Sequence, residues 1–253
     1  MTTPEIVSKS VWEGFERTDF TLAGRPGHII HPESPLPGNP WVWRAEFFGA
    51  FDMADRALLA KGWHIAYYRL SDMYGCPEAV EQMKVFHDMA VSHFGLDPKA
   101  DLFGFSRGGL YSVNYAANYP ADVSVLYLDA PVLDFRSWPG GLGDGVGAPS
   151  CWTECLACYH LSEAQARAYD KQPLDRIPAL IAADIPIMLV AGGSDSVVPY
   201  HENGMILHKE YTMRGGRIRT IVKPDCEHHP HSLEDPSPIV EMIEQIRRER
   251  SGR

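Results

Sequence analysis

The fold is decided by the segment Ala100-Asp101-Leu102-Phe103-Gly104-Phe105-Ser106-Arg107-Gly108-Gly109. Its first six residues form a short, mainly apolar run that predicts a buried strand, and the residues from Arg107 to Tyr119 predict a helix. Between them lies a Gly-x-Ser-x-Gly motif, which is typical of a sharp strand-to-helix turn that holds its serine in a strained conformation. We therefore expect the Ser106 hydroxyl to be exposed at the carboxyl edge of a sheet, where it can act as a nucleophile.

Strand and helix patterns alternate on both sides of this motif. Further strands are predicted at 41–44, 63–70, 123–128, 185–191 and 217–223, and further helices around 51–58, at 80–94 and from 238 to about 248. Two early strands, joined by a turn at 24–27, are predicted between Trp12 and Pro32. This alternation indicates an α/β fold, with a mostly parallel sheet covered by helices on both sides.

The alternation stops between Val132 and Asp184. This region begins with the glycine-rich loop 138–143 and continues with helical patterns but no strand. A connection of this length is usually functional. We expect a cap at about 133–184 that roofs the site and is inserted into a single domain spanning residues 1–253.

An acid and a base follow two late strands. Asp195 lies in the loop after the strand at 185–191, and His228 follows the strand at 217–223. The chain order Ser, Asp, His is the order in which a sheet of this kind supplies a nucleophile, an orienting acid and a general base. The sequence thus predicts that Ser106, Asp195 and His228 act together.

Neighbouring residues leave two alternatives open. Asp129 also follows a strand and is the alternative acid, although a structural ion pair with Arg107 or Arg136 would explain it equally well. His229 is the alternative base, and His231 is expected to brace the loop.

An oxyanion hole is expected beside the serine. The helix that starts after Ser106 directs free N–H groups toward the reacting carbonyl, so the Arg107 N–H is the first predicted donor. The second donor should come from the loop at 43–46, and the backbone of Arg44 or Ala45 is the prediction, without the glycine-rich loop that is usual there.

With these residues in place, the chain resembles the α/β-hydrolase superfamily over nearly its whole length. The resemblance implies an eight-stranded sheet with the cap inserted after strand 6. More narrowly, residues 40–48, 137–141 and 228–233 resemble a group of bacterial hydrolases often placed among polysaccharide-degrading esterases. That likeness implies an acyl or methyl ester on a sugar as substrate. Glu227 stands where the group has a glycine before the catalytic histidine, so the local turn can differ.

Four side chains are candidates for substrate contact. Trp43 and Trp138 are predicted to stack on sugar rings, with core or cap packing as the alternative. Arg44 and Arg107 could bind a substrate carboxylate through a bidentate fork, with internal ion pairs as the alternative.

Metal and cofactor sites are not predicted. Cys151, Cys155 and Cys158 have the C-x3-C-x2-C spacing of some iron–sulfur proteins, but the same spacing puts them on one helix face, where packing is expected. A zinc site from His229 and His231 lacks the H-E-x-x-H spacing or a matching carboxylate.

Composition excludes several classes of partner. The formal net charge is -10 and basic residues cluster only at the C-terminus, so a nucleic-acid partner is not expected. No apolar run approaches the roughly 20 residues that span a bilayer, and residues 1–14 lack a secretory signal pattern. We expect a cytoplasmic enzyme whose five cysteines stay reduced, while the oligomeric state is not predicted.

The function predicted from these observations is hydrolysis of a carboxylic ester on a small molecule or a carbohydrate, through an acyl-enzyme and without a cofactor. Two alternatives stay open. One is a peptidase or amidase that uses the same three residues, and the other is a non-catalytic binding protein that uses the hydrolase pocket as a receptor.

Overall fold

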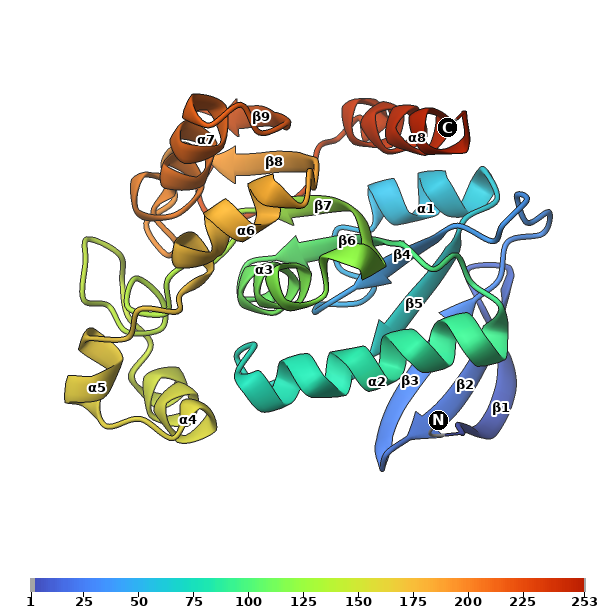
Figure 1. Ribbon diagram of the computed structural model, residues 1–253, viewed down its shortest axis with the longest axis horizontal. Coiled ribbons are helices and arrows are strands. Elements are labelled where there is room, and N and C mark those ends of the chain that lie inside the picture. Colours follow the sequence, from blue (N-terminus) through green and yellow to red (C-terminus); the bar gives the residue numbers. More distant parts are fainter. Residues whose placement is uncertain (1–2, 253) are drawn as a thin grey trace.

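A nine-stranded mixed sheet forms the centre of the computed structural model, which describes residues 3–252 (Figure 1). The strands lie in the order β1-β2-β3-β5-β4-β6-β7-β8-β9. The first three strands form an antiparallel meander that joins β5, and every pair from β5 through β9 is parallel. The strands are β1 Glu5–Trp12, β2 Phe15–Leu22, β3 Arg25–Ile30, β4 Trp41–Arg44, β5 His64–Tyr68, β6 Ala100–Phe105, β7 Val123–Asp129, β8 Ile187–Gly192 and β9 Ile218–Lys223.

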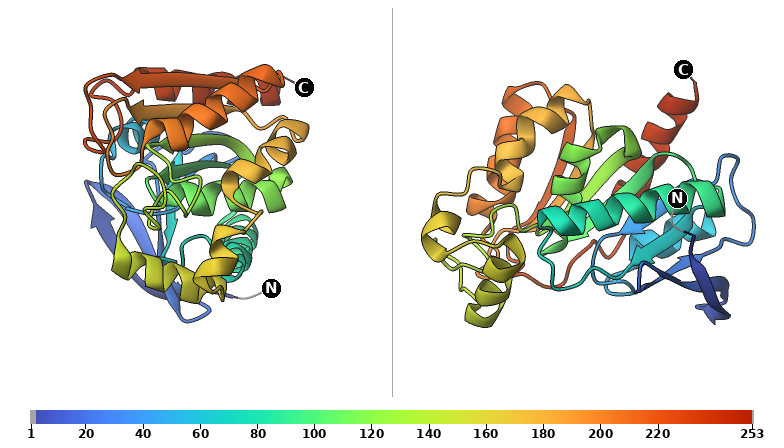
Figure 2. Two further views of the ribbon diagram at one scale, coloured as in Figure 1. Left: turned by 90° about the vertical axis from the view of Figure 1, so that its left-hand side faces the viewer. Right: turned by 60° about the horizontal axis from the view of Figure 1, so that its bottom comes forward.

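Helices cover both faces of this sheet, as the alternating pattern predicts. One layer contains α2, α3, α6 and α7, which share a buried core with the sheet, and the opposite layer contains α1 and α8 (Figures 1 and 2). The helices are α1 Met53–Ala60, α2 Pro77–Phe94, α3 Gly108–Asn118, α4 Pro149–Tyr159, α5 Glu163–Arg167, α6 Ile177–Ala182, α7 Gly204–Met213 and α8 Ser237–Ser251. Each large apolar side chain that these helices bury contributes about 1.5–3 kcal/mol relative to its exposed state.

The expected eight strands are wrong by one, because the N-terminal region holds three strands where the sequence predicts two. The extra strand β1 is exposed over nearly its whole length, so its residues carry no alternation of buried and exposed positions. The expected turn at 24–27 is also displaced: β2 and β3 are joined by Ala23 and Gly24, both with positive φ, which is the geometry of a tight two-residue hairpin.

The segment between β7 and β8 contains the region expected to form a cap. Its helices α4 and α5 stand beyond the carboxyl ends of the parallel strands (Figure 1), whereas α6 contacts α3 within the helical layer. Because β1 adds a strand, this segment follows the seventh strand of the chain and not the sixth. Cys155 is buried and Cys151 and Cys158 are half-buried against the same core, which agrees with the expected packing.

The five cysteines are free thiols. Among residues 3–252, no helix combines the length and the apolar composition needed to cross a bilayer.

Candidate active site

Ser106 occupies a strained turn between β6 and α3. Its φ is +48°, a left-handed conformation that costs a non-glycine residue about 1–2 kcal/mol. Two backbone hydrogen bonds hold the turn: the Ser106 N–H donates to the Asp129 carbonyl at 2.9 Å, and the Val132 N–H donates to the Ser106 carbonyl at 2.9 Å. The end of β7 and the segment after it therefore fix the elbow, and the positive φ of Ser106 is the strained conformation that the motif predicts.

Two glycines make this turn sterically possible. A Cβ on Gly104 would lie 2.1 Å from Ser112 Oγ, and a Cβ on Gly109 would lie 2.7 Å from both the Pro131 Cβ and the Val132 carbonyl oxygen. Real Cβ atoms do not approach other atoms so closely, so larger residues at these positions would push α3 away from the elbow.

A continuous hydrogen-bonded chain joins the three residues that the sequence predicts to act together. Ser106 Oγ lies 2.9 Å from His228 Nε2, and His228 Nδ1 lies 2.7 Å from Asp195 Oδ2. The second carboxylate oxygen of Asp195 accepts the N–H groups of Val197 and Val198 at 2.9 and 2.8 Å. Asp195 and His228 are buried, so the carboxylate is held in one orientation by two backbone donors and one imidazole.

Glu227 connects the loops that carry the acid and the base. Its Oε2 accepts the Ser196 N–H at 3.2 Å and the Ser196 hydroxyl at 3.1 Å, and the Ser194 N–H donates to the Cys226 carbonyl at 3.0 Å. The position where the resembled group has glycine thus carries a side chain that stabilises the site. No pattern in the sequence points to this contact.

The alternative base and acid lie close by but do not reach Ser106. The His229 ring stacks on Phe51 at a centroid distance of 5.6 Å and has no hydrogen-bond partner among residues 3–252. Burial and the neighbouring histidines lower the pKa of His229, which favours the neutral form of its ring. Asp129 pairs with His231, Oδ1 to Nδ1 at 2.8 Å.

The expected ion pair of Asp129 with Arg107 or Arg136 is wrong. Arg136 pairs with Asp134 at 2.6 Å, and Arg107 pairs with Glu46, so neither arginine reaches Asp129. The Asp129 pair with His231 agrees with the expectation that His231 braces its loop.

Two backbone N–H groups at the elbow are candidates for an oxyanion hole. Within residues 3–252 the N–H groups of Arg107 and Glu46 have no hydrogen-bond partner, and the Glu46 nitrogen lies 3.8 Å from where a Cβ on Gly108 would be. Both are available to a developing oxyanion.

The predictions of Arg44 and Ala45 as the second donor are wrong. The Ala45 N–H donates to the Phe103 carbonyl at 3.0 Å, and Arg44 is the last residue of β4, inside the ladder between β5 and β6. Both backbones serve the sheet, so the free donor is Glu46, one residue further along the loop.

The side chains of the two donor residues form an ion pair. Arg107 Nε lies 2.8 Å from Glu46 Oε2, and Arg107 Nη1 lies 3.0 Å from Asp72 Oδ1. Burial raises the pKa of Glu46, while Arg107 and the Ser71 hydroxyl favour its charged form. Because the guanidinium of Arg107 is paired with two carboxylates of the protein, it does not form the expected bidentate contact with a substrate carboxylate.

Arg44 is likewise used internally. Its guanidinium is fully buried, lies 3.3 Å from Asp55 and donates to the carbonyls of Phe47 and Ala50 at 2.9 and 2.8 Å. Arg44 therefore shapes the loop after β4, which carries the Glu46 donor and one wall of the site.

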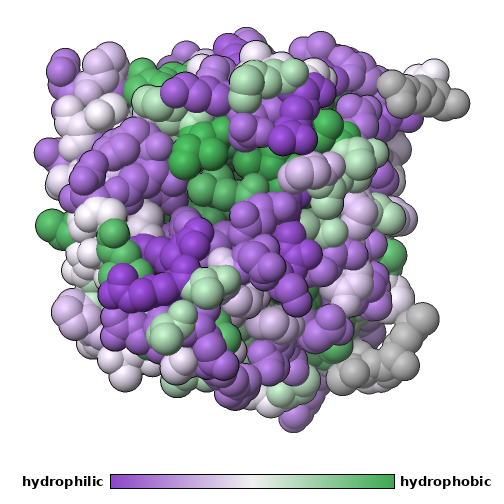
Figure 3. Space-filling view, turned by 60° about the vertical axis from the view of Figure 1, so that its left-hand side comes forward, coloured by the Kyte–Doolittle hydropathy of each residue, from purple (hydrophilic) through white to green (hydrophobic). Residues whose placement is uncertain are grey.

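A cavity of about 270 Å³ opens at Ser106. Its lining consists of an apolar wall and three imidazoles: Phe47, Ala50, Phe51, Phe105, Ser106, His228, His229 and His231. Figure 3, which brings the left-hand side of Figure 1 forward, shows an apolar area bordered by hydrophilic residues on this side of the molecule.

The predicted substrate contact by Trp43 is wrong. Trp43 is 1% exposed and stacks on Trp41 in the core, because β4 is buried on both faces. Trp138 is half-buried beside Tyr74, with ring centroids 6.4 Å apart, and does not line the 270 Å³ cavity. Its contact with a substrate stays a prediction.

Two groups of side chains in the described part of the chain could hold a metal ion. One is His228, His229 and His231, and the other is Asp144, His201 and Glu202. The second group is on the surface near a larger cavity of about 480 Å³ that includes no residue of the hydrogen-bonded chain. There Glu202 already accepts hydrogen bonds from Ser137 and from the Asp144 backbone.

Comparison with solved structures identifies the fold. Porphyromonas gingivalis dipeptidyl peptidase 4 is similar with a TM-score of 0.65 and 13% identity, over 97% of this chain and 35% of that one. A Mycobacterium tuberculosis puromycin-hydrolysing peptidase has a TM-score of 0.67 and 14% identity, over 97% and 38% of the two chains. A lipase candidate from Acinetobacter baumannii has a TM-score of 0.60 and 14% identity, over 93% of each chain.

These similarities establish that the chain has the α/β-hydrolase fold. The chain spans little more than a third of the length of the two peptidases. No protein-family model and no curated protein matches the sequence. The resemblance to carbohydrate esterases therefore stays a prediction.

Proposed function

We propose that this protein is a serine hydrolase that cleaves a carboxylic ester through an acyl-enzyme, with Ser106 as nucleophile, His228 as general base and Asp195 as orienting acid. The observation that carries the proposal is the hydrogen-bonded chain from Ser106 Oγ to His228 and on to Asp195, with distances of 2.9 and 2.7 Å. Ser106 itself lies in a strained turn, beside the Arg107 and Glu46 N–H groups that have no partner among residues 3–252, and this is the arrangement that acyl transfer needs.

Acylation follows from this geometry. His228 Nε2 takes the proton of Ser106 as Oγ bonds to the ester carbonyl carbon, and the N–H groups of Arg107 and Glu46 stabilise the oxyanion. His228 then donates that proton to the leaving alkoxide oxygen, so an alcohol departs and the acyl group stays on Ser106. Water repeats the sequence and releases the carboxylic acid. The mechanism needs no metal or organic cofactor.

Asp195 controls which nitrogen of His228 carries the proton. Its carboxylate accepts the Nδ1 proton, so Nε2 keeps a lone pair for the Ser106 hydroxyl. When His228 becomes an imidazolium, the buried carboxylate stabilises the charge. Asp195 thus acts through His228 and does not contact the substrate.

The cavity supports a short acyl group. Three aromatic side chains, Phe47, Phe51 and Phe105, leave about 270 Å³ beside Ser106, which suits an acetyl or similarly small apolar group better than a long chain. For the alcohol side we propose a small molecule or a carbohydrate, on the strength of the resemblance in residues 40–48, 137–141 and 228–233. A cytoplasmic location remains part of this proposal.

A peptidase or amidase activity is the second candidate. Two of the similar structures are peptidases, and the same three residues can expel an amine if His228 protonates the leaving nitrogen. Matched ester and amide substrates with the same acyl group separate the two candidates. A non-catalytic binding role is less favoured, because it would not require Ser106, His228 and Asp195 to be hydrogen-bonded in sequence.

The test is a hydrolysis panel of acetyl, methyl, feruloyl and longer-chain esters, each with its amide counterpart. We expect wild type to hydrolyse short acyl esters fastest, Ser106→Ala to lose the activity, and Ser92→Ala on the exposed side of α2 to keep it. Equal rates for wild type and Ser106→Ala would reject the proposal. Faster cleavage of the amides would favour the peptidase.

A further inference from the structure

A second Asp–His pair lies beside the first and has no part in acyl transfer. Asp129 Oδ1 is 2.8 Å from His231 Nδ1, and both side chains are buried, at 1% and 4% exposure. The other carboxylate oxygen of Asp129 accepts the Tyr127 hydroxyl at 2.7 Å and the Ser232 N–H at 2.8 Å. The carboxylate is therefore fixed, and with it the orientation of the His231 ring.

The two pairs prepare two imidazoles in the same way. In each pair the carboxylate accepts the Nδ1 proton, so Nε2 of His228 and Nε2 of His231 both keep a lone pair, and the lone pair of His228 faces the Ser106 hydroxyl. A carboxylate behind a histidine, with the opposite nitrogen unprotonated, is the arrangement that orients histidine ligands of zinc. His229 supplies a third imidazole between them.

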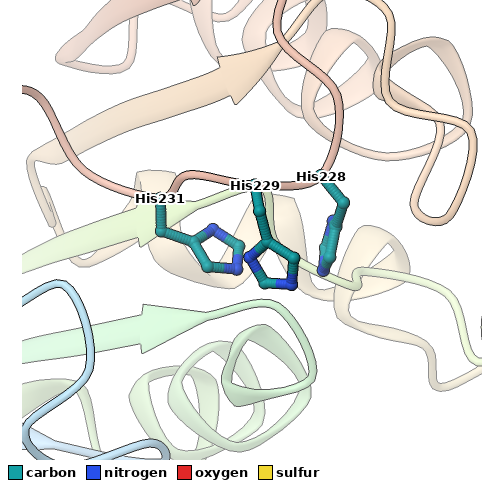
Figure 4. Close-up of side chains that lie close together, drawn as sticks. All are labelled: His228, His229 and His231. Atoms are coloured by element: carbon teal, nitrogen blue, oxygen red, sulfur yellow. The ribbon is translucent and has the colours of Figure 1, made fainter.

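The three imidazoles converge (Figure 4). Their ring centroids form a nearly equilateral triangle with sides of 4.9, 4.9 and 4.8 Å, and the rings are inclined to one another by 66 to 86°. One ring nitrogen from each residue lies within 4.8 Å of the other two. Three nitrogens bound to zinc at about 2.0–2.1 Å would be about 3.4 Å apart, so a bound ion would draw these three nitrogens closer together.

An ion can reach this position from solvent. The three histidines line the open 270 Å³ cavity, and His229 is exposed. The carboxylates of Asp129 and Asp195 lie directly behind two of the ligands, so a dication would have its charge balanced by two nearby negative charges. Neutral nitrogen ligands of this kind suit Zn²⁺ and other late transition-metal dications, and not Mg²⁺ or Ca²⁺.

Metal binding and hydrolysis would compete for one lone pair. The nitrogen that must accept the Ser106 proton, His228 Nε2, is the nitrogen that a metal would occupy. The ion would also lie beside Ser106 Oγ, with this oxygen or a water as the fourth ligand.

We propose that His228, His229 and His231 form a binding site for Zn²⁺ or a similar late transition-metal dication, and that the bound ion reversibly inhibits the hydrolase. The inhibitory part rests on the proposed function. The binding part does not, because the three ligands are independent of the identity of the substrate.

The test measures metal binding and activity separately. Co²⁺ is titrated into metal-free Ser106→Ala protein, which keeps all three imidazoles, and the visible absorption of nitrogen-bound tetrahedral Co²⁺ reports occupancy. We expect saturation at one ion per chain. His229→Gln and His231→Gln should each weaken binding by more than about 100-fold, and Asp129→Asn, which removes the carboxylate behind one ligand, by about 10- to 100-fold.

A matched control comes from the other candidate metal group. His201→Gln removes a ligand from the surface group of Asp144, His201 and Glu202 and should leave the binding curve unchanged. Unchanged binding in the exposed variant His229→Gln, whose ring contributes little to folding, would overturn the proposed site. So would loss of binding in His201→Gln.

The activity measurement uses wild type, with Zn²⁺ set by a metal buffer and a short acyl ester as substrate. We expect inhibition that a chelator reverses, with a Zn²⁺ concentration for half inhibition more than about 100-fold higher in His229→Gln than in wild type. Full activity at saturating Zn²⁺ would overturn the inhibitory role. Retention of activity by Ser106→Ala would instead refute the proposed function and leave the binding result intact.

Discussion

The Asp195→Asn variant tests how the acid controls its histidine. In wild type, one carboxylate oxygen accepts the N–H groups of Val197 and Val198 at 2.9 and 2.8 Å, and the other accepts the His228 Nδ1 proton at 2.7 Å. An asparagine keeps its oxygen on the two backbone donors, so its NH₂ group faces Nδ1. The imidazole proton then moves to Nε2, which can no longer accept the Ser106 hydroxyl proton.

The magnitude follows from the cost of reversing the amide. If the asparagine amide turned so that its oxygen faced His228, its NH₂ group would face the N–H groups of Val197 and Val198. Each of these two buried donors would then lack an acceptor, which costs about 1–3 kcal/mol per donor, or about 2–6 kcal/mol in total. The productive tautomer is therefore reduced by about 30- to 10⁴-fold. Serine proteases with the same triad lose about 10⁴-fold in kcat from this change, so we expect a loss of about 10³- to 10⁴-fold.

The assay is kcat for a short acyl ester, with Asp129→Asn as the matched control. Asp129 makes the same contact with His231, but His231 does not touch Ser106, so we expect kcat of the control to stay within about tenfold of wild type. Thermal unfolding of both variants verifies that they fold. A loss below tenfold in Asp195→Asn, or a larger loss in Asp129→Asn, would refute this assignment of the acid.

Three further predictions test the oxyanion hole, the acyl pocket and the acid stability. Glu46→Gln removes the negative charge that pairs with Arg107, so we expect the two N–H donors to be held less rigidly. The kcat should fall about 10- to 100-fold with KM little changed, and a rise in KM at constant kcat would contradict this prediction. Ala50→Leu narrows the 270 Å³ cavity, so the ratio of kcat/KM for acetyl over butyryl esters should increase, and an unchanged ratio would show that the acyl group lies elsewhere. His28 and His64 are buried with pKa values lowered by burial to about 3 and about 4, so the unfolded chain binds more protons below pH 6.5 and the free energy of unfolding falls as pH drops through this range. His64→Phe removes one such ring, whose nitrogens have no partner among the described residues. The free energy of unfolding of this variant, measured relative to wild type by urea unfolding, should be about 2 kcal/mol higher at pH 5 than at pH 8. An equal difference from wild type at the two pH values would contradict this prediction.

The sequence predicts the central residues because each of them follows a strand with a strong pattern. Parallel strands bring their carboxyl ends to one edge of the sheet. Because Ser106, Asp195 and His228 each follow such a strand, they are expected to lie near one another. The hydrogen bonds of 2.9 and 2.7 Å agree with that reasoning.

Other features depend on contacts that leave no local pattern. Glu46 and Arg107 are 61 residues apart in the chain, and neither has a neighbour that indicates the ion pair. The availability of the Glu46 N–H depends on where β4 ends and on which strand accepts the Ala45 N–H, and a boundary error of one residue is enough to misassign the donor.

Burial explains the remaining errors. Trp43 is in a strand that is buried on both faces, so its aromatic character reflects core packing and not a surface for sugars. The strand β1 is missing from the sequence prediction for the opposite reason, because it is exposed. Its apolar residues Ile6, Val7 and Val11 face solvent and form no apolar side. The convergence of three histidines is also invisible in the sequence, because it depends on the course of a loop.

Covalent labelling with a fluorophosphonate, followed by peptide mass spectrometry, tests the nucleophile most directly. We predict one adduct per chain, located on the peptide that contains Ser106, absent from Ser106→Ala and formed much more slowly by His228→Ala. A folded wild-type protein that stays unlabelled, or that carries its adduct on another residue, would contradict the account.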